Sequence, residues 1–262
     1  MLNKDFAICI QASDFSETSQ VLAFFGRQSG KIRCIAKGSK RQKSAFDGPV
    51  EIFAYGNIVF TSSEDKLATL TEFQQQKPFS ALAKNLPALN SAMFAAELLN
   101  KFTKDYDPHP RLFDDFLQFL QNINQPVVSL SNPTPDTRYA SLSFLILFQL
   151  SLLKEIGLQP VLDKCVNCTT SCAPPNTSDE RRGTSDETYF SSSANGLICK
   201  DCEPAFPDKV KLSAQSAKCL KHLKLIADAD EKTLNEIERV LIYHFTELLN
   251  RPPKMAKYIL KS

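Results

Sequence analysis

The sequence predicts an α+β protein, with an N-terminal five-stranded barrel followed by an all-helical domain that carries a four-cysteine zinc-binding module. Three observations predict this arrangement. Up to about residue 75, turn-forming residues separate short runs of β-branched and aromatic side chains. From about residue 80, apolar residues recur every three or four positions, as on a helix. Two Cys-x-x-Cys pairs, Cys165/Cys168 and Cys199/Cys202, interrupt the helical pattern.

The barrel is predicted from the candidate strands of the N-terminal region. Glycine, proline and polar residues separate these strands, as is typical of tight turns. Five short strands within about 70 residues favour a small barrel, for which the OB fold is the natural candidate. The candidate strands are Ala7–Ala12, Val21–Phe25, Ile32–Lys37, Val50–Phe60 and Leu67–Phe73.

Helical spacing follows the last strand. Apolar residues from Leu82 to Leu99, and again from Leu112 to Leu120, fall on one face of a helix. The run Tyr139–Ile156 is apolar on most faces, which is typical of a central helix in a bundle. Further amphipathic helices are expected to begin near Ser213, a candidate N-cap. We expect the helices before and after the cysteines to pack together.

The chain is therefore expected to contain four segments. In order, these are an OB-fold nucleic-acid-binding domain, the first part of a helical domain, the zinc-binding module and the second part of the helical domain. Their predicted bounds are 1–78, 79–160, 161–206 and 207–262. Loops are expected where prolines gather, from about Asn124 to Thr137, and in the polar stretch Pro174–Thr188.

The two cysteine pairs have the spacing of a zinc site. Each pair places two soft sulfur ligands on one turn, and Cys165, Cys168, Cys199 and Cys202 together can close a tetrahedral Zn²⁺ site. Four thiolates leave no open coordination position, so the expected role is structural. The gap from 169 to 198 is longer than the usual 15–20 residues. Cys172 could replace one of the four, and a redox-active pair or unligated thiols are the alternatives.

A basic segment lies within the predicted barrel. No Asp or Glu occurs from Thr18 to Phe46, whereas the net charge of the whole chain is only +2. In the strand Lys31–Lys37, alternate residues should face inward, which leaves cations on the outer face. Such a face suits a phosphate backbone, although a merely solvated face is the alternative. The candidate DNA-binding residues are Arg27, Lys31, Arg33, Lys37, Lys40, Arg41 and Lys43.

Two aromatic residues of the next candidate strand have two interpretations. Phe53 and Tyr55 share one strand face and could stack on bases. We favour the interpretation that they belong to the core.

The sequence offers little support for catalysis. The histidines are His109, His222 and His244, and the last two are expected to be packing or surface residues. No His begins the His-x-Glu motif of zinc deaminases, and no Gly-x-Ser-x-Gly occurs. The run from Gly26 to Ile32 resembles a phosphate-binding loop but is one residue short and lacks the Ser or Thr that binds magnesium. We therefore expect a protein that is not an enzyme.

The sequence also indicates a compartment. No apolar run approaches the roughly 20 residues of a membrane span, and no secretory signal is apparent. Eight cysteines in such a chain are expected to be reduced thiols, in a cytoplasmic protein.

Taken together, these motifs resemble those of the bacterial RecO family of recombination mediators, over nearly the whole chain. The N-terminal part of the resemblance is an early Ser-Glu, a Gly-Lys and a Lys-Gly basic turn. The C-terminal part is a helix that ends in Gly-Leu-x-Pro before Cys-x-x-Cys, and the second cysteine pair with its lead-in. The matching residues are Ser16-Glu17, Gly30-Lys31, Lys37-Gly38, Gly157 to Pro160, Cys165 to Cys168, Tyr189 to Ser191 and Gly196 to Cys202.

The resemblance implies a function in DNA repair. It implies an OB domain, a helical domain and a zinc module whose ligands are the four paired cysteines. It also implies binding of single- and double-stranded DNA and annealing of complementary strands. Together with RecR, such a protein would help load RecA onto DNA covered by single-strand binding protein. The C-terminal tail of single-strand binding protein is implied as a further partner. A nucleoid-associated bacterial protein is expected. The alternative is an interaction scaffold for acidic protein tails with little DNA binding of its own.

Overall fold

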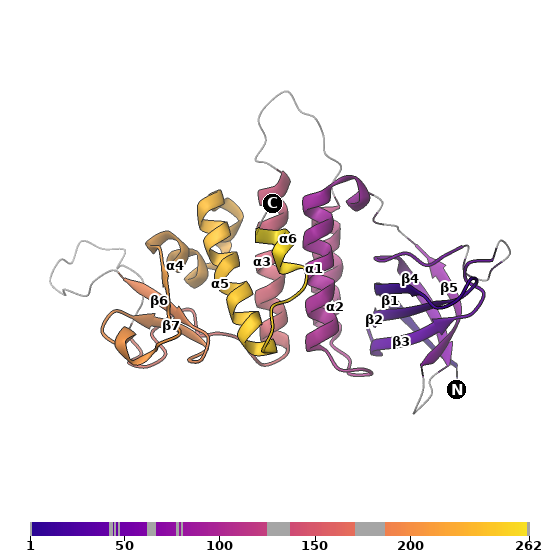
Figure 1. Cartoon of the computed structure of the whole chain (residues 1–262), viewed down its shortest axis with the longest axis horizontal. Helices are drawn as coiled ribbons and strands as arrows, with labels where there is room; N and C mark the ends of the chain where they lie inside the picture. The colour runs from indigo at the N-terminus through magenta and orange to yellow at the C-terminus, as the bar shows by residue number, and fades with distance from the viewer. Residues whose placement is uncertain are drawn as a thin grey trace, which may run out of the picture. The chain divides into compact units, whose positions relative to one another are not determined.

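The computed structural model describes residues 2–41, 44, 46, 48–61, 67–76, 79, 81–124, 137–170 and 187–260. It forms two compact units, Met1–Val128 and Ser129–Ser262, here called the barrel unit and the helical unit and described separately (Figure 1). Most of the two predicted loops, in 125–136 and 174–186, lies outside the described residues. Cys172 and Lys43 lie outside them as well.

The barrel unit begins with a closed five-stranded barrel in the order β1-β2-β3-β5-β4, which confirms the predicted OB-type barrel. β1 pairs with β2 and β4, and a parallel pairing of β3 with β5 closes the barrel. A register shift between Cys9 and Gln11 bends the long first strand. The strands are β1 (Leu2–Asp14), β2 (Gln20–Gly26), β3 (Gly30–Ala36), β4 (Tyr55–Thr61) and β5 (Ala68–Gln75).

The barrel core follows from the alternation of the strands. On β3, Ile32, Cys34 and Ala36 face the interior, as predicted, and are fully buried. Phe24 and Phe73 pack together there, with ring centroids 5.6 Å apart. Burial raises the pKa of the Cys34 thiol to about 12, so this cysteine behaves as a small apolar residue.

The predicted strand Val50–Phe60 is too long. Regular pairing begins only at Tyr55, because Phe53 has a φ of 66° and the chain turns between Glu51 and Ala54. The backbone of Phe53 and Ala54 instead bonds to Cys9 at the bend of β1, with N–O distances of 2.7 and 2.8 Å.

Two helices pack against the barrel within the same unit. Helix α1 (Leu86–Phe102) follows the short 3₁₀ helix η1 (Leu82–Lys84) and contacts β1, and α2 (Pro110–Ile123) contacts β2 (Figure 1). Asn85 caps α1 by accepting a hydrogen bond from the amide of Ala88. Phe113, on the apolar face of α2, packs against Phe25 of β2, and the centroids of the two rings are 6.2 Å apart.

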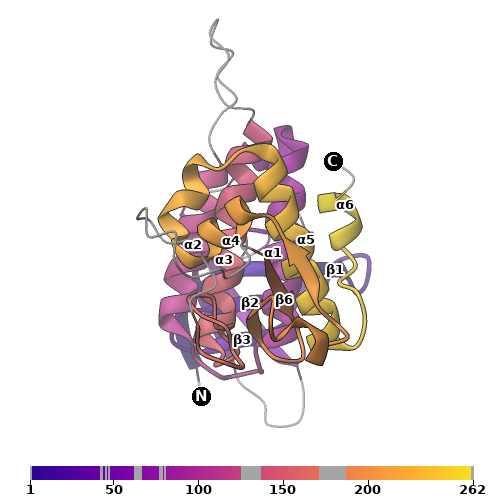
Figure 2. The same ribbon diagram turned by 90° about the vertical axis from the view of Figure 1, so that its left-hand side faces the viewer.

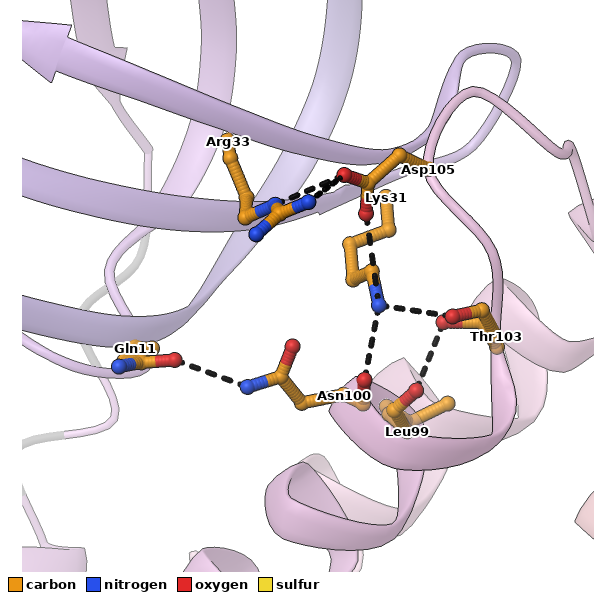
Figure 3. A network of polar contacts seen from close by, with 7 residues as sticks. All are labelled: Gln11, Lys31, Arg33, Leu99, Asn100, Thr103 and Asp105. Atoms are coloured by element: carbon orange, nitrogen blue, oxygen red, sulfur yellow. Dashed lines mark hydrogen bonds and ion pairs between the residues drawn. The ribbon is translucent and has the colours of Figure 1, made fainter. Parts of the chain in front are cut away.

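A buried lysine joins the barrel to the end of α1. Lys31 is 7% exposed, and its ammonium donates to the carbonyls of Asn100 and Thr103, both at 2.7 Å (Figure 3). These carbonyls lie where the helix ends and lack helical partners, so a cation there satisfies two acceptors and complements the helix dipole. The carboxylate of Asp105 lies 3.4 Å from the same ammonium and also accepts from Arg33.

The residue before Lys31 permits this close approach. Gly30 has a φ of 67°, and a Cβ there would lie 2.2 Å from the carbonyl oxygen of Asp107. The backbone of Lys31 forms a parallel bridge with Asp105, and the amide of Tyr106 donates to the Lys31 carbonyl at 2.9 Å. The Gly-Lys pair therefore anchors the segment that joins α1 to α2.

The helical unit combines helices with a small sheet. Helix α5 packs against α3 and α4, so helices before and after the cysteines are in contact (Figure 1 and Figure 2). Ser213 caps α4, as predicted. The three-stranded sheet, in the order β7-β6-β8, was not predicted. The elements are α3 (Thr137–Glu155), β6 (Thr188–Ser191), β7 (Gly196–Cys199), η2 (Glu203–Ala205), β8 (Val210–Leu212), α4 (Ala214–Lys221), η3 (Leu223–Asp228), α5 (Glu231–Leu249) and α6 (Ala256–Leu260).

The contact of α3 with α5 contains a buried acid. Glu238 is 1% exposed, and the amide of Gln149 donates to both of its carboxyl oxygens at 2.9 Å. Burial raises the pKa of Glu238 to about 8 because it penalises the charged form. The Gln149 Oε1 has no hydrogen-bond partner among the described residues, so a protonated Glu238 could donate to it after a rotation of the amide.

In the described part of the chain, no helix has the length and apolar character needed to cross a membrane.

Replacement of Lys31 should loosen the end of α1. In Lys31→Met the carbonyls of Asn100 and Thr103 lose their donor inside the protein, which should cost about 1–3 kcal/mol locally. Hydrogen exchange followed by mass spectrometry should show faster exchange in peptides from 98–107. Lys37→Met, at an exposed position, is the matched control, and equal exchange in the two variants would contradict the anchoring role.

The raised pKa of Glu238 predicts a pH-dependent stability. In the unfolded chain the Glu238 carboxyl has its ordinary pKa of 4.5, whereas in the folded protein this pKa is about 8. The stability that comes from keeping Glu238 neutral is therefore lost as the pH rises from 4.5 toward about 8. Glu238→Gln should therefore stabilise the helical unit at pH 8.5 by roughly 2 kcal/mol and by less at pH 6.5. Urea unfolding at the two pH values measures the difference, with the exposed Glu247→Gln as control. A constant difference would argue against titration of Glu238.

Candidate nucleic-acid interface and metal centre

The structure brings the four paired cysteines together. The sulfur atoms of Cys165, Cys168, Cys199 and Cys202 all lie within 4.8 Å of one another. The Sγ atoms of Cys168 and Cys199 are 3.6 Å apart. A tetrahedral site with Zn–S bonds of about 2.3 Å needs sulfur atoms roughly 3.8 Å apart. The arrangement therefore fits one metal ion with four sulfur ligands.

Two turns position these sulfurs. The first pair lies on a tight turn in which the amide of Thr169, with a φ of 61°, donates to the carbonyl of Cys165 at 3.0 Å. The second pair follows β7, and the amide of Cys202 donates to the carbonyl of Cys199 at 3.2 Å. The amide of Val166 donates to Leu197 of β7 at 2.9 Å, which ties the two turns together.

A glycine allows the two turns to approach. A Cβ on Gly196 would lie 2.5 Å from the carbonyl oxygen of Val161 and 2.6 Å from the Val166 side chain. Val161 leads into Cys165 and Val166 directly follows it on the first turn, so only glycine fits at the start of β7 without displacing that turn.

Polar side chains surround the sulfurs. The Asn167 amide donates to the Cys202 Sγ at 3.3 Å, and the Thr170 hydroxyl lies 3.4 Å from the Cys168 Sγ. Hydrogen bonds with Thr170, and further ones with Cys165 and Cys199, lower the pKa of Cys168 to about 6, whereas burial raises the pKa of Cys199 to about 12. Hydrogen bonds to sulfur favour the thiolate, the form that binds a metal.

The basic segment of the barrel is divided into two groups. In the first, each cation has an acidic partner from the α1–α2 region. Arg27 makes a two-pronged contact with Asp114, at 2.8 and 2.7 Å, and these hydrogen bonds lower the pKa of the carboxyl group. Arg33 donates to Asp105 at 2.7 Å, and Lys31 is the buried anchor (Figure 3). The expectation that Lys31 is accessible on the outer face is wrong, because the end of α1 covers it.

The second group lies at the turn after β3. Lys37 and Arg41 are exposed, and no described carboxylate lies within ion-pair distance of either. Lys40 pairs with Asp14 at 2.8 Å, and that carboxylate is largely exposed. The turn thus presents three cations, of which only Lys40 has a described acidic partner.

A buried hydrogen-bond chain holds this basic turn in place. Ser39 is fully buried, and its hydroxyl donates to the Gln20 Oε1 at 2.9 Å. Gln20 in turn bonds to both the amide and the carbonyl of Val50, at 2.9 and 3.1 Å. The neighbouring cations therefore project from a fixed backbone, which lowers the entropy lost on binding.

The run from Gly26 to Ile32 is not a phosphate-binding loop. It forms the β2–β3 turn, and the amides of Gln28 and Ser29 donate to the Asp5 carboxylate at 3.0 and 2.7 Å. The amides that would bind a phosphate are already bonded to an anion of the protein itself.

The remaining candidates lie in the core or on the surface. Phe53 is 3% exposed. Tyr55 packs edge-on against Phe6, with ring centroids 4.8 Å apart. Both observations support the interpretation of these aromatic residues as packing residues. His244 is fully buried, and its Nδ1 lies 2.8 Å from the Ser192 hydroxyl. Burial lowers the pKa of His244 to about 4, so it is neutral at pH 7. His222 is exposed.

Comparisons with known proteins agree with this architecture. The family model described as "Recombination protein O N terminal" matches residues 1–79, and "Recombination protein O C terminal" matches residues 83–257. Proteins named DNA repair protein RecO are similar to the chain. The Bacillus pumilus protein is 27% identical over 99% of this chain and 94% of its own length, and the Bacillus subtilis protein is 26% identical over 94% and 89%. The relative from Halalkalibacterium halodurans is 28% identical over 84% of this chain and 77% of its own length. The chain belongs to the RecO family of DNA repair proteins.

Proposed function

We propose that this chain is a non-enzymatic recombination mediator that binds single- and double-stranded DNA and anneals complementary strands. The observation that carries the proposal is the rigid basic turn on the OB-type barrel, where Lys37 and Arg41 have no described acidic partner. OB folds bind oligonucleotides through the strand 2–3 face and the loops between strands 1 and 2 and between strands 4 and 5. The basic turn follows β3 directly and is bonded to the β1–β2 loop, where the Lys40 amide donates to the Thr18 carbonyl. Lys43, in the same basic run, is proposed to extend the contact.

The mechanism of annealing is electrostatic. Cations at the turn neutralise phosphates and release condensed counterions, which supplies affinity without sequence preference. Two strands held by one basic surface repel each other less, and their local concentration rises. Base pairing then supplies the specificity.

The proposed partners are RecR, the C-terminal tail of single-strand binding protein and, indirectly, the RecA filament. With RecR, the chain would help RecA load onto DNA covered by single-strand binding protein, in association with the bacterial nucleoid. Support for this role comes from the family, whose members are named for DNA repair.

A groove in the helical unit favours a second function, as a scaffold for acidic protein tails. The groove has a volume of about 470 Å³ and combines apolar side chains with two lysines and one acid, Asp163. The excess of positive charge beside apolar side chains suits an acidic peptide with an apolar end. Peptide binding combined with negligible DNA affinity would favour this function over annealing. Its lining includes Pro160, Leu162, Lys164, Leu220, Lys221 and Leu223.

We also propose that the metal of the four-cysteine site is Zn²⁺ with a structural role. The donor set supports this identity, because four thiolates at tetrahedral spacing match structural zinc sites. Zinc bound by four thiolates has no open position for a substrate, so it stabilises the fold and takes no part in catalysis.

Each of the four ligands should be required for zinc binding. Serine at Cys165, Cys168, Cys199 or Cys202 should reduce the metal content from about one zinc per chain toward zero and unfold the module locally. Elemental analysis of the purified variants measures the metal content, and hydrogen exchange measures the local unfolding. Cys172→Ser is the matched control and should retain zinc. Loss of zinc from this control, with retention in one of the four variants, would place Cys172 among the ligands.

Charge reversal at the basic turn should abolish annealing. Lys37→Glu, Lys40→Glu and Arg41→Glu combined should weaken binding to all DNA sequences alike, by at least about tenfold near 0.1 M salt. Fluorescence anisotropy measures the affinity, and a strand-annealing assay across a salt series measures the activity. Lys232→Glu, an exposed site in the first turn of α5, is the control. Unchanged affinity in the triple variant would reject this turn as the DNA site.

A further inference from the structure

Phe15 is an exposed aromatic residue in the loop between β1 and β2. Its side chain is 65% exposed, among the highest values for large apolar residues in the described part of the chain. A single exposed apolar side chain is common and by itself indicates nothing. The position of Phe15 beside the basic turn is what distinguishes it.

The loop that carries Phe15 is bonded to the basic turn. Within the loop, the amides of Phe15 and Ser16 donate to the carbonyl of Ser19, at 3.0 and 3.2 Å. The amide of Lys40 donates to the Thr18 carbonyl at 3.1 Å. The aromatic ring and the cations are therefore attached to one hydrogen-bonded framework.

The turn beside Phe15 carries cations that complement a nucleic acid. Asp14, which directly precedes Phe15, holds the ammonium of Lys40 at 2.8 Å. Lys37 and Arg41 flank that lysine in the sequence and are exposed. An aromatic face beside several cations is the combination by which proteins bind single strands, because bases stack on the ring while cations contact the phosphates.

We infer that Phe15 stacks on an unpaired base of single-stranded DNA whose phosphates contact Lys37, Lys40 and Arg41. This inference rests on the proposed function and adds a means of selecting single strands. Cations bind the phosphates of single and double strands alike, whereas the base faces inside a duplex are already stacked. Stacking on Phe15 should tolerate any base, since every base has an aromatic face.

The absence of tryptophan from the chain provides a direct test. Phe15→Trp introduces a single indole, and a saturating oligothymidine strand should quench its fluorescence. Leu86→Trp is the matched control, because Leu86 is 66% exposed in the same unit, and its emission should change little. In parallel, Phe15→Ala should weaken oligothymidine binding about tenfold and change duplex binding less than about twofold.

An abasic strand of equal length separates stacking from charge. Wild-type protein should bind the abasic strand about as weakly as Phe15→Ala binds oligothymidine. Unchanged Phe15→Trp emission on a bound strand, or equal weakening of single- and double-strand binding in Phe15→Ala, would overturn the inference and leave DNA binding standing. Quenching by an acidic peptide but not by oligothymidine would also overturn it. Failure of the wild type to bind any DNA would overturn the proposed function as well.

Discussion

The buried ammonium of Lys31 is the interaction on which the barrel unit depends. It lies at the end of α1, where it bonds to two carbonyls that the helix leaves unpaired and faces the carboxylate of Asp105. A cation enclosed in this way is stable only when its donors are satisfied, so strand, helix and connecting segment must keep one arrangement. Gly30 contributes by letting the backbone of the 103–107 segment pass close to β3.

This anchor also decides which cations are available to a ligand. Arg27 and Arg33 are bonded to Asp114 and Asp105, so the cations nearest the helices are already paired within the unit. Lys37, Lys40 and Arg41 lie on the turn after β3, which the buried Ser39 holds in place, and we propose that they bind DNA. In the helical unit, the cysteine cluster is proposed to have a comparable structural role, because it brings together two turns that have few apolar residues.

Local patterns predicted much of the fold, and long-range contacts account for what they missed. Alternation along β3 placed Ile32, Cys34 and Ala36 inside the barrel, and the Cys-x-x-Cys spacing predicted a four-sulfur cluster. The acid-free segment suggested a uniform basic face. The acidic partners of Arg27 and Arg33 come from more than 70 positions later in the sequence, so no local pattern reveals them. The strands of the small sheet have only three or four residues, too few to show a period.

The basic segment is thus divided between cations paired inside the barrel unit and cations proposed to contact DNA. This division is tested most directly by the salt dependence of DNA binding in two double variants that remove the same charge, Arg27→Gln/Arg33→Gln and Lys37→Gln/Arg41→Gln. The slope of log K against log salt should become shallower by about 2 in the second variant and stay near the wild-type value in the first. An equal loss of slope in both variants, or a loss only in the first, would contradict the account.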